Sequence, residues 1–587
     1  MKQNHTNHNV LYVDVGSVNT RVCLFDNADG KYAFIGAASA NGSSGNSNQT
    51  EYLSIVEAVQ KLERATRRKL LDRNQNIVMP VNIDRTGVDQ VAVSYTRAAD
   101  PRIALMGLTH GGSLKNMRDL LSSVGIEPIV EICSQDGKST AENLDLLLNA
   151  APRIVILGGG LEAGAETGVY RLGEILMLAC RSLPREQRPI VLFMGNSAAK
   201  SQMDRVISRL TDLTFTANVL EPGTGVQSSL NGLINVLRKD LELRTPGFKT
   251  LREKTKSSLI PGEFSFGRSI RLMSRLIRQN HHVLGIDIGA RQTIFADAVN
   301  LNLSLQTLPM GVGNGIARVL DEIAAAEIVN WIGFQIKASE VQDYIMNKCY
   351  YPELVPANKY SAEIELAIAR LILRRGIENS KFPINLTNGS LAMVLLSGAL
   401  LRNVEDPGEA LRVAMDSLAP AGMVDYLLDM NGLTGAIGTL AHQNPVLTAQ
   451  IMNTSVYLNL GRVIRPLSAQ QALGKPVMKI SLQDEAGNVR EYDVPNGRIF
   501  RIPLEYGRNY ELNWISIPRS VTIPGVKTWA PVGFKSGCFG LIFDTREVKD
   551  GKMKLPNDKA ARLRALESWR EELGTWLQKP DEEGSDA

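Results

Sequence analysis

The sequence predicts an α/β protein with two related halves, followed by a small C-terminal all-β domain. Three observations support this prediction. A strand–turn–strand motif occurs twice, as VLYVDVGSVNTRVCLF at Val10–Phe25 and as VLGIDIGARQTIFADA at Val283–Ala298. Between the two copies, apolar strands alternate with helices, a pattern typical of a largely parallel sheet with helices on both faces. After Leu467 the chain changes to short strands separated by turns.

The length of 587 residues exceeds what one hydrophobic core supports, so we expect two or three domains. The first half is expected over residues 1–240, and a basic connector over 241–282. The second half, with a helical insertion, is expected over 283–465. A small β-domain is expected over 475–546, and an amphipathic helix with an acidic tail over 547–587.

Composition and charge are ordinary for a globular protein. The net charge of +4 is small for this length, and the basic stretch Arg238–Arg278 is not followed by aromatic stacking positions, so we do not expect a nucleic-acid partner. The five cysteines include no CxxC pair, which argues against a zinc site or a disulfide framework and fits a reducing, cytoplasmic location. The longest apolar run, Leu391–Leu401, is too short to span a membrane.

The repeated motif has the chemistry of a phosphate site. Each copy places an aspartate, Asp14 or Asp287, at the end of a buried strand and a glycine, Gly16 or Gly289, two residues later. Small polar residues follow: Ser17 and Thr20 in the first copy, Thr293 in the second. Backbone N–H groups and hydroxyls at such a turn can bind phosphate, and the aspartate can hold Mg²⁺ through water. One copy alone is a common hairpin, but two copies in matching strand context favour a nucleotide site.

Loops at the carboxyl ends of the predicted parallel strands are a second place where ligands bind. Three such loops stand out in the first half: Gly158-Gly159-Gly160, Gly195-Asn196-Ser197 and Glu221-Pro222-Gly223. A glycine after a strand can be required only by the backbone conformation of a tight turn, without any ligand. Three such loops together also allow a shared pocket or a partner surface, and both interpretations stay open.

Taken in order, the motifs resemble the MutL-type proteins linked to glutamate mutase, which belong to the actin/sugar-kinase/Hsp70 ATPase superfamily and are unrelated to the mismatch-repair protein of the same name. The resemblance covers roughly residues 10–455 and rests on DVGSVNTR, SYTRAADPRIALMGLT, IVILGGGLEAG, FMGN, NVLEPG, SLIPGEFSFGRSIRLMSRL and VLLSGALL. It implies a duplicated actin-like (ribonuclease H-like) ATPase fold with a helical insertion. It also implies ATP and Mg²⁺ as cofactors.

The resemblance also implies a role for each site residue. Asp14 and Asp287 would be the catalytic carboxylates, and Asp14 would hold the metal. The phosphate-binding residues would be Gly16, Ser17, Thr20, Gly289 and Thr293. Gly398, in a turn after the strand Met393–Leu396, would lie near adenosine. The family's second hairpin usually has a second glycine and a small residue where this chain has Ala290 and Arg291.

The function implied by the resemblance is that of an ATP-binding accessory protein. It would act like a reactivase or chaperone on a partner enzyme, with a cobalamin-dependent mutase as the candidate, and would be at most a slow or partner-stimulated ATPase. One alternative is a degenerate, non-hydrolysing scaffold, which the changed second hairpin and the added β-domain support. Another is a small-molecule kinase, although no carboxylate can be singled out to face an acceptor hydroxyl. His110 and His442 are isolated in the sequence, which favours structural roles.

Overall fold

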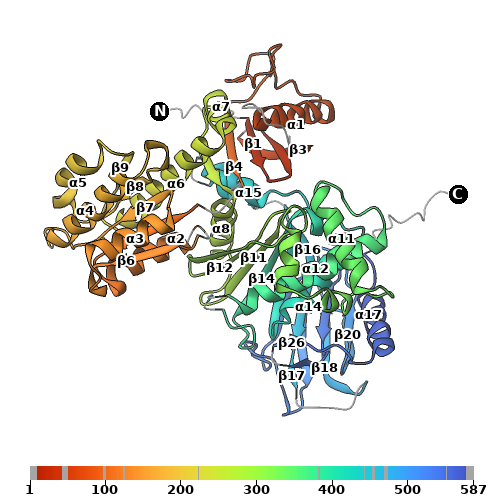
Figure 1. The fold of residues 1–587 in the computed structure, drawn as a ribbon. Helices are drawn as coiled ribbons and strands as arrows, with labels where there is room; N and C mark the ends of the chain where they lie inside the picture. The colour runs from red at the N-terminus through yellow and green to blue at the C-terminus, as the bar shows by residue number, and fades with distance from the viewer. Residues whose placement is uncertain are drawn as a thin grey trace, which may run out of the picture. The chain divides into compact units, whose positions relative to one another are not determined.

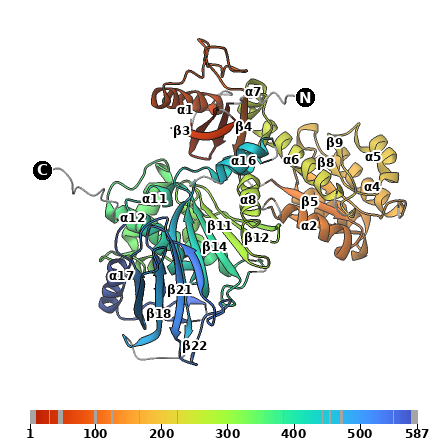
Figure 2. The same ribbon diagram turned by 180° about the vertical axis from the view of Figure 1, so that it is seen from behind.

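The computed structural model describes residues 9–576, with gaps at residues 29, 43–49, 97–100, 123, 125, 165, 222–223, 381, 383, 442, 453–455, 469–473 and 550 (Figures 1 and 2). His442, Pro222, Gly223 and the acidic end of the tail therefore lie outside the described residues. The chain divides into two compact units, Met1–Ser265 and Phe266–Ala587.

The first unit begins with a five-stranded sheet in the order β10-β4-β1-β2-β3. Its strands are β1 (Val10–Val15), β2 (Asn19–Ala28), β3 (Lys31–Asn41), β4 (Gln90–Tyr95) and β10 (Leu259–Pro261). The first three form an antiparallel meander, whereas β4 runs parallel to β1 and β10 runs parallel to β4. The predicted first hairpin is therefore β1 and β2.

Helix α1 (Thr50–Thr66) packs on this sheet through a stripe of apolar side chains. Ile55, Val59 and Leu62 follow helical spacing and are fully buried against residues of β1 and β2. The segment expected as a connector is itself folded. Within it α7 (Pro246–Thr255) contacts α1 and α6, and β10 forms one edge of the sheet because it pairs with β4.

The first unit also contains a second, fully parallel sheet in the order β6-β5-β7-β8-β9. Its strands are β5 (Ile103–Gly107), β6 (Val130–Cys133), β7 (Ile154–Leu157), β8 (Ile190–Phe193) and β9 (Leu213–Phe215). The runs IVIL in β7 and IVLF in β8 are apolar throughout because both faces of the sheet are covered. The chain direction across the sheet reverses at β5, which creates a switch point between β5 and β7.

Helices cover both faces of this parallel sheet (Figure 1). On one face lie α2 (Lys115–Ser122) and α6 (Thr224–Arg244). On the other face lie α3 (Thr140–Ala150), α4 (Thr167–Ser182) and α5 (Lys200–Ile207). Short helical turns occur at His110–Leu114, a π-helix, and at Ser134–Asp136, Arg185–Gln187 and Ser197–Ala199.

The second unit repeats the topology of the first sheet. Its strands β11 (His282–Ile288), β12 (Thr293–Val299) and β13 (Asn302–Leu308) form an antiparallel meander, and β14 (Leu391–Ser397) and β15 (Gly422–Leu428) continue the sheet in parallel. In both units the order is therefore third, second, first, fourth and fifth strand. This internal duplication confirms the predicted actin-like, ribonuclease H-like fold class.

A helical insertion separates β13 from β14. Its main helices are α11 (Ala338–Tyr350) and α12 (Lys359–Glu378), and α12 packs with α14 (Pro407–Leu418) in the largest hydrophobic core. Helix α8 (Gly262–Met273) contributes Phe266 and Ile270 to a separate core with β11 and β12. The remaining helices are Ile316–Arg318, α9 (Val319–Glu322), α10 (Ala325–Val329), α13 (Ala399–Arg402), α15 (Thr434–Leu440) and α16 (Pro445–Met452).

The C-terminal strands form β-sheets, as the sequence predicts (Figure 2). Four of them, β19 (Val489–Pro495), β18 (Pro476–Asp484), β21 (Asn509–Ser516) and β23 (Val532–Lys535), form one antiparallel sheet in that order. Others extend the sheet of the second unit: β16 (Leu458–Arg465) pairs with β15, β24 (Leu541–Asp544) with β16, and β20 (Ile499–Ile502) with β24. The β-domain is therefore continuous with the sheet rather than separate from it.

The remaining C-terminal elements are two small ladders and one helix. Strand β17 (Leu467–Ser468) pairs with β22 (Val521–Thr522), and β25 (Val548–Lys549) pairs with β26 (Lys552–Met553). Helix α17 (Lys559–Leu573) is the predicted amphipathic helix, and its buried residues Leu566, Trp569 and Leu573 belong to the main core of the second unit.

Candidate functional site

The turns of the two hairpins have the same backbone geometry. The Gly16 N–H donates to the Asn19 carbonyl oxygen at 3.0 Å, and the Gly289 N–H donates to the Gln292 carbonyl oxygen at 3.0 Å. A Cβ atom would lie 2.6 Å from that oxygen at Gly16 and 2.8 Å at Gly289. Real Cβ atoms do not approach so closely, so both positions require glycine for the same reason.

Asp14 lies at the carboxyl end of β1, half-buried between Arg21 of β2 and Ser94 of β4. The Ser94 hydroxyl donates to Asp14 Oδ1 at 2.7 Å. Because that hydroxyl hydrogen is used on Asp14, the Tyr12 hydroxyl donates in turn to Ser94 Oγ, at 2.6 Å. Ser94 is buried, so this short chain of hydrogen bonds fixes the orientation of the carboxylate.

Asp287 occupies the equivalent position in the second unit. It lies on β11 between Ile294 of β12 and Ser397 of β14, just as Asp14 lies beside Ser94. An aspartate–serine pair at the carboxyl ends of the first and fourth strands is therefore common to both units. Neither serine was predicted to lie beside an aspartate, although each belongs to an apolar run, VAVSY or VLLS.

The second hairpin and the Gly398 turn lie against each other. Gly398 has a φ of +112°, and a Cβ atom there would lie 2.3 Å from the Ile288 carbonyl oxygen. The preceding Ser397 hydroxyl lies 3.5 Å from Asp429 Oδ2. The structure thus brings together three of the predicted residues of the second unit, Asp287, Gly289 and Gly398, along with the buried Asp429.

Asp429 is a further acidic residue that the sequence analysis missed. It follows β15 directly, is fully buried, and caps the start of α15. Its Oδ1 accepts from the Leu433 N–H at 2.9 Å, and its Oδ2 accepts from the Thr434 N–H at 2.9 Å and from the Thr434 hydroxyl at 2.6 Å. These bonds use both carboxylate oxygens, so Asp429 fixes the loop beside Ser397.

A glycine-rich segment covers the second turn. The N–H groups of Val312, Gly313 and Gly315 donate to the Gly289 and Ala290 carbonyl oxygens at 3.1, 2.8 and 2.9 Å. A Cβ atom on Gly313 would lie 2.7 Å from the Ala290 methyl group. The methyl group that replaces the family's usual glycine therefore packs against a position that has no side chain.

The two predicted threonines are buried within their hairpins. The Thr20 hydroxyl is hydrogen-bonded to the Ser54 hydroxyl of α1 at 2.7 Å, and the Thr293 hydroxyl donates to the Met310 carbonyl oxygen at 2.9 Å. Their exposed fractions are 1% and 0%. Both hydroxyls thus stabilise the hairpins, and direct contact with phosphate stays a prediction.

The residues present suit a nucleotide with its metal ion. Two half-buried carboxylates, Asp14 and Asp287, lie at the carboxyl ends of the central strands, where ligands bind in open sheets. Each lies beside a turn that requires glycine. Oxygen ligands are those that Mg²⁺ prefers, and glycine turns allow backbone N–H groups to approach phosphate.

A family model described as MutL protein matches residues 10–456. The chain belongs to the MutL family. This is the glutamate mutase-linked family that the motifs resemble, and its model covers both hairpins and the Gly398 turn. No curated protein matches the chain in sequence.

Several solved structures resemble this MutL-family chain at low similarity. Nucleotide-free acetone carboxylase has 12% identity and a TM-score of 0.37, covering 74% of this chain and 70% of its own. The activator of 2-hydroxyisocaproyl-CoA dehydratase from Clostridium difficile has 10% identity and a TM-score of 0.27, covering 76% and 99%. A glycerol dehydratase reactivase has 10% identity and a TM-score of 0.30, covering 74% and 100%. Likenesses this distant assign no activity to the chain.

Membrane insertion through a helix finds no support in the MutL-family structure. Among the residues that the structure describes, none of the helices is both long and apolar enough to cross a bilayer.

Proposed function

We propose that this MutL-family protein is an ATP-binding accessory protein that acts on a partner enzyme in the manner of a reactivase or chaperone, and that the partner is a cobalamin-dependent mutase. The observation that carries the proposal is the repeated site geometry. Both units place an aspartate beside a serine, and next to an obligatory glycine turn, at the carboxyl end of the central strand. A purely architectural repeat would not need the same polar pair twice.

The proposed roles follow from these positions. Asp14 holds Mg²⁺ through water. Gly16, whose N–H closes the turn on the Asn19 carbonyl oxygen, lets the backbone come close to phosphate, and the Ser17 hydroxyl contacts phosphate. Asp287 and Gly289 serve the second hairpin in the same way. Gly398, whose turn packs against the second hairpin, would lie near adenosine, and Thr20 and Thr293 hold the two turns in shape.

The proposed protein is at most a slow ATPase without its partner. The carboxylate of Asp14 is engaged by Ser94, so it orients ions and water rather than acting as a freely moving base. In proteins of this kind, work on a partner comes from the difference in affinity between two conformations. We therefore expect hydrolysis to rise when the partner binds.

Isothermal titration of the full chain with ATP and Mg²⁺ tests nucleotide binding. We expect saturable binding that Asp14→Ala weakens at least about tenfold, since one charge-assisted contact contributes about 1.5–3 kcal/mol. The matched control is Asp145→Ala, which removes an exposed carboxylate from α3. Equal ATP affinity of Asp14→Ala and the control would mean that the phosphates do not bind at the first hairpin. If no ATP binds at millimolar concentration, the protein would instead be the non-hydrolysing scaffold.

A second experiment tests the partner. ATP turnover is measured with the full chain alone and with a cobalamin-dependent glutamate mutase added in active or cobalamin-damaged form. The proposal expects turnover to rise with the mutase and the rise to be lost in Asp14→Ala. Unchanged turnover, together with no co-migration of the two proteins in size-exclusion chromatography, would reject a mutase as the partner while leaving nucleotide binding intact.

A further inference from the structure

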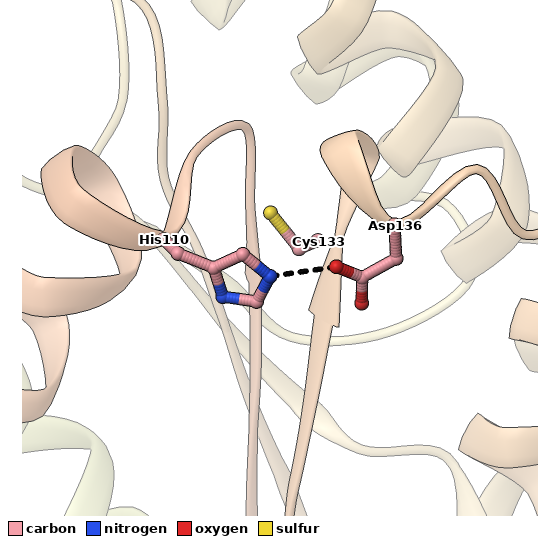
Figure 3. A group of neighbouring side chains, drawn as sticks. All are labelled: His110, Cys133 and Asp136. Carbon is pink, nitrogen blue, oxygen red and sulfur yellow. Dashed lines mark hydrogen bonds and ion pairs between the residues drawn. The ribbon is translucent and has the colours of Figure 1, made fainter.

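Three side chains that could ligate a metal ion meet in the first unit, at its parallel sheet rather than at the sheet that carries the first hairpin (Figure 3). They are His110, Cys133 and Asp136. One ligand atom from each, a nitrogen, a sulfur and an oxygen, lies within 4.8 Å of the other two. His110 Nε2 is 2.6 Å from Asp136 Oδ1, and the Cys133 thiol donates to the Leu108 carbonyl oxygen at 3.5 Å.

The order of strands in the parallel sheet brings these residues together. Cys133 is the last residue of β6 and lies opposite Gly107, the last residue of β5. His110 begins the π-helix that follows β5, and Asp136 ends the helical turn that follows β6. All three thus lie at the carboxyl edge of the parallel sheet, beside the neighbouring strands β5 and β6. Single π-helical turns also occur frequently at functional sites.

We propose that His110, Cys133 and Asp136 form a site for zinc or another late first-row divalent cation. A thiolate, an imidazole and a carboxylate are the three ligand types that zinc takes in proteins. A set that contains sulfur and nitrogen disfavours Mg²⁺ and Ca²⁺, which bind oxygen atoms. The site is therefore chemically distinct from the proposed magnesium position at Asp14.

The geometry needs only a small adjustment. Donor atoms bound to one zinc ion at about 2.0–2.3 Å lie roughly 3.3–3.8 Å apart in a tetrahedron. The contact between His110 and Asp136 would open by about 1 Å, and the sulfur would move by a similar amount. The His110 side chain is 53% exposed and the Asp136 side chain 24%, so both have room to turn.

Proton balance is simple for this site. The Cys133 thiol loses its proton to solvent as the zinc–sulfur bond forms, and neutral His110 binds through a ring nitrogen lone pair without a proton change. A bound metal ion would supply the positive charge that stabilises the Cys133 thiolate.

Three protein ligands would leave one position of a tetrahedral zinc site without a protein ligand. Zinc sites with three protein ligands keep that position for water or for an exogenous donor. Arg118 and Lys138 hold the surrounding loops, since Arg118 donates to the His110 carbonyl oxygen at 3.3 Å and Lys138 Nζ lies 3.9 Å from Asp136 Oδ2. Of these two contacts, only the one from Lys138 involves the side chain of a proposed ligand, at Asp136 Oδ2.

Cobalt titration of the metal-free, full-length protein tests the proposal, because a cobalt–thiolate bond gives a near-ultraviolet charge-transfer band. We expect one equivalent of Co²⁺ to produce that band and Zn²⁺ to abolish it. Cys133→Ser should remove the band. His110→Gln and Asp136→Asn should each weaken binding at least about tenfold, as loss of even an outer partner does. Cys180→Ser, at a buried cysteine of α4, is the matched control and should retain the band.

Two outcomes would overturn the proposal. One is the absence of a thiolate band at several equivalents of Co²⁺, because binding through imidazole alone, for example at His5 and His8, gives no such band. The other is a band that survives in Cys133→Ser. Circular dichroism confirms that each variant is folded. Because Asp136 lies partly exposed, Asp136→Asn tests the site even where replacement of the buried cysteine disturbs the sheet.

Discussion

Arg546 Nη1 donates to Asp416 Oδ1 at 2.7 Å, and both side chains are 1% exposed. Asp416 belongs to α14, inside the region that matches the MutL family, whereas Arg546 follows β24 and lies beyond it. Arg546 also bonds both carboxylate oxygens of Asp544, and its guanidinium lies 4.5 Å from the ring centre of Trp569. A buried ion pair thus joins the C-terminal extension to the family core.

Replacing Arg546 should be strongly destabilising. Arg546→Met removes one partner from Asp416 and Asp544 and leaves two buried carboxylates with fewer counter-charges, which typically costs about 3–5 kcal/mol. The measurement is the free energy of unfolding from urea denaturation. The control, Arg508→Met, breaks an exposed pair with Glu505 and should change little. Equal stability of the two variants would show that the buried pair contributes nothing.

The same cluster predicts a loss of stability in acid. Burial raises the pKa of Asp544, but Arg465 and Arg546 outweigh burial and hold that pKa below its usual value. Burial also lowers the pKa of Arg465, yet an arginine stays charged throughout the acid range. Because the folded-state pKa is depressed, the stabilisation is complete above the unfolded-state pKa of about 3.9 and is lost as the pH falls through the folded-state value.

Asp544→Asn tests this pH dependence. We expect the variant to be less stable than the wild-type protein at pH 7, and the difference to shrink as the pH falls below about 4. Thermal unfolding midpoints recorded from pH 7 to pH 3 give the comparison. A difference that stays constant over this range would mean that the folded-state pKa of Asp544 is not depressed.

The hairpins were predictable because their signal is local. The motif Asp-x-Gly between two apolar runs is typical of a strand–turn–strand unit. The turns at Gly16 and Gly289 have the expected geometry. The partners of Asp14 and Asp287 were not predicted. Ser94 and Ser397 come to lie beside them only because the first strand pairs with the fourth, 80 residues away in the first unit and 110 in the second.

Alanine at the first glycine should disturb the turn. In Gly16→Ala the new methyl group would lie 2.6 Å from the Asn19 carbonyl oxygen, so the backbone must shift. We expect a loss of about 1–3 kcal/mol in the free energy of unfolding, typical of overpacking, together with weaker ATP binding. Gly533→Ala is the control, since nothing lies within 4 Å of the added methyl group. Wild-type behaviour of Gly16→Ala in both measurements would contradict the turn geometry.

Restoring the family's usual glycine at position 290 should have little effect. The Ala290 methyl group packs against Gly313 within the protein, so it does not occupy the phosphate side of the turn. We expect Ala290→Gly to change ATP affinity less than about threefold, within the usual ±0.5 kcal/mol of a neutral change. Isothermal titration measures the affinity. A gain of tenfold or more would support the degenerate scaffold.

The cysteines should differ sharply in reactivity. Among the five, Cys349 alone is partly exposed, whereas Cys23, Cys133, Cys180 and Cys538 are buried. Burial raises the pKa of Cys180 to about 11 and that of Cys538 to about 12. We therefore expect iodoacetamide to modify Cys349 first in the native protein at pH 8, as peptide mass spectrometry would show. Modification of all five cysteines at similar rates would contradict the burial of the other four side chains.

The cluster of His110, Cys133 and Asp136 could not be predicted from the spacing of its residues in the sequence. His110 is isolated in the sequence, and spacing argued against a zinc site. The three residues meet because β5 and β6 are neighbours and parallel, so their carboxyl ends share one edge. A largely parallel sheet was predicted for this part of the chain, but which of its strands are neighbours was not. The order of strands, which depends on packing across the whole sheet, could not be deduced from either strand alone.

The pairing of β16 with β15 has a consequence for where the protein can be divided. The family match ends at Val456, two residues before β16 begins, and β24 and β20 continue the same sheet. A fragment that stops at the family boundary would present β15 as an open edge, with unpaired N–H and C=O groups free to recruit another copy. The extension therefore completes the sheet of the family core, and a well-behaved shorter protein would need another strand in the place of β16.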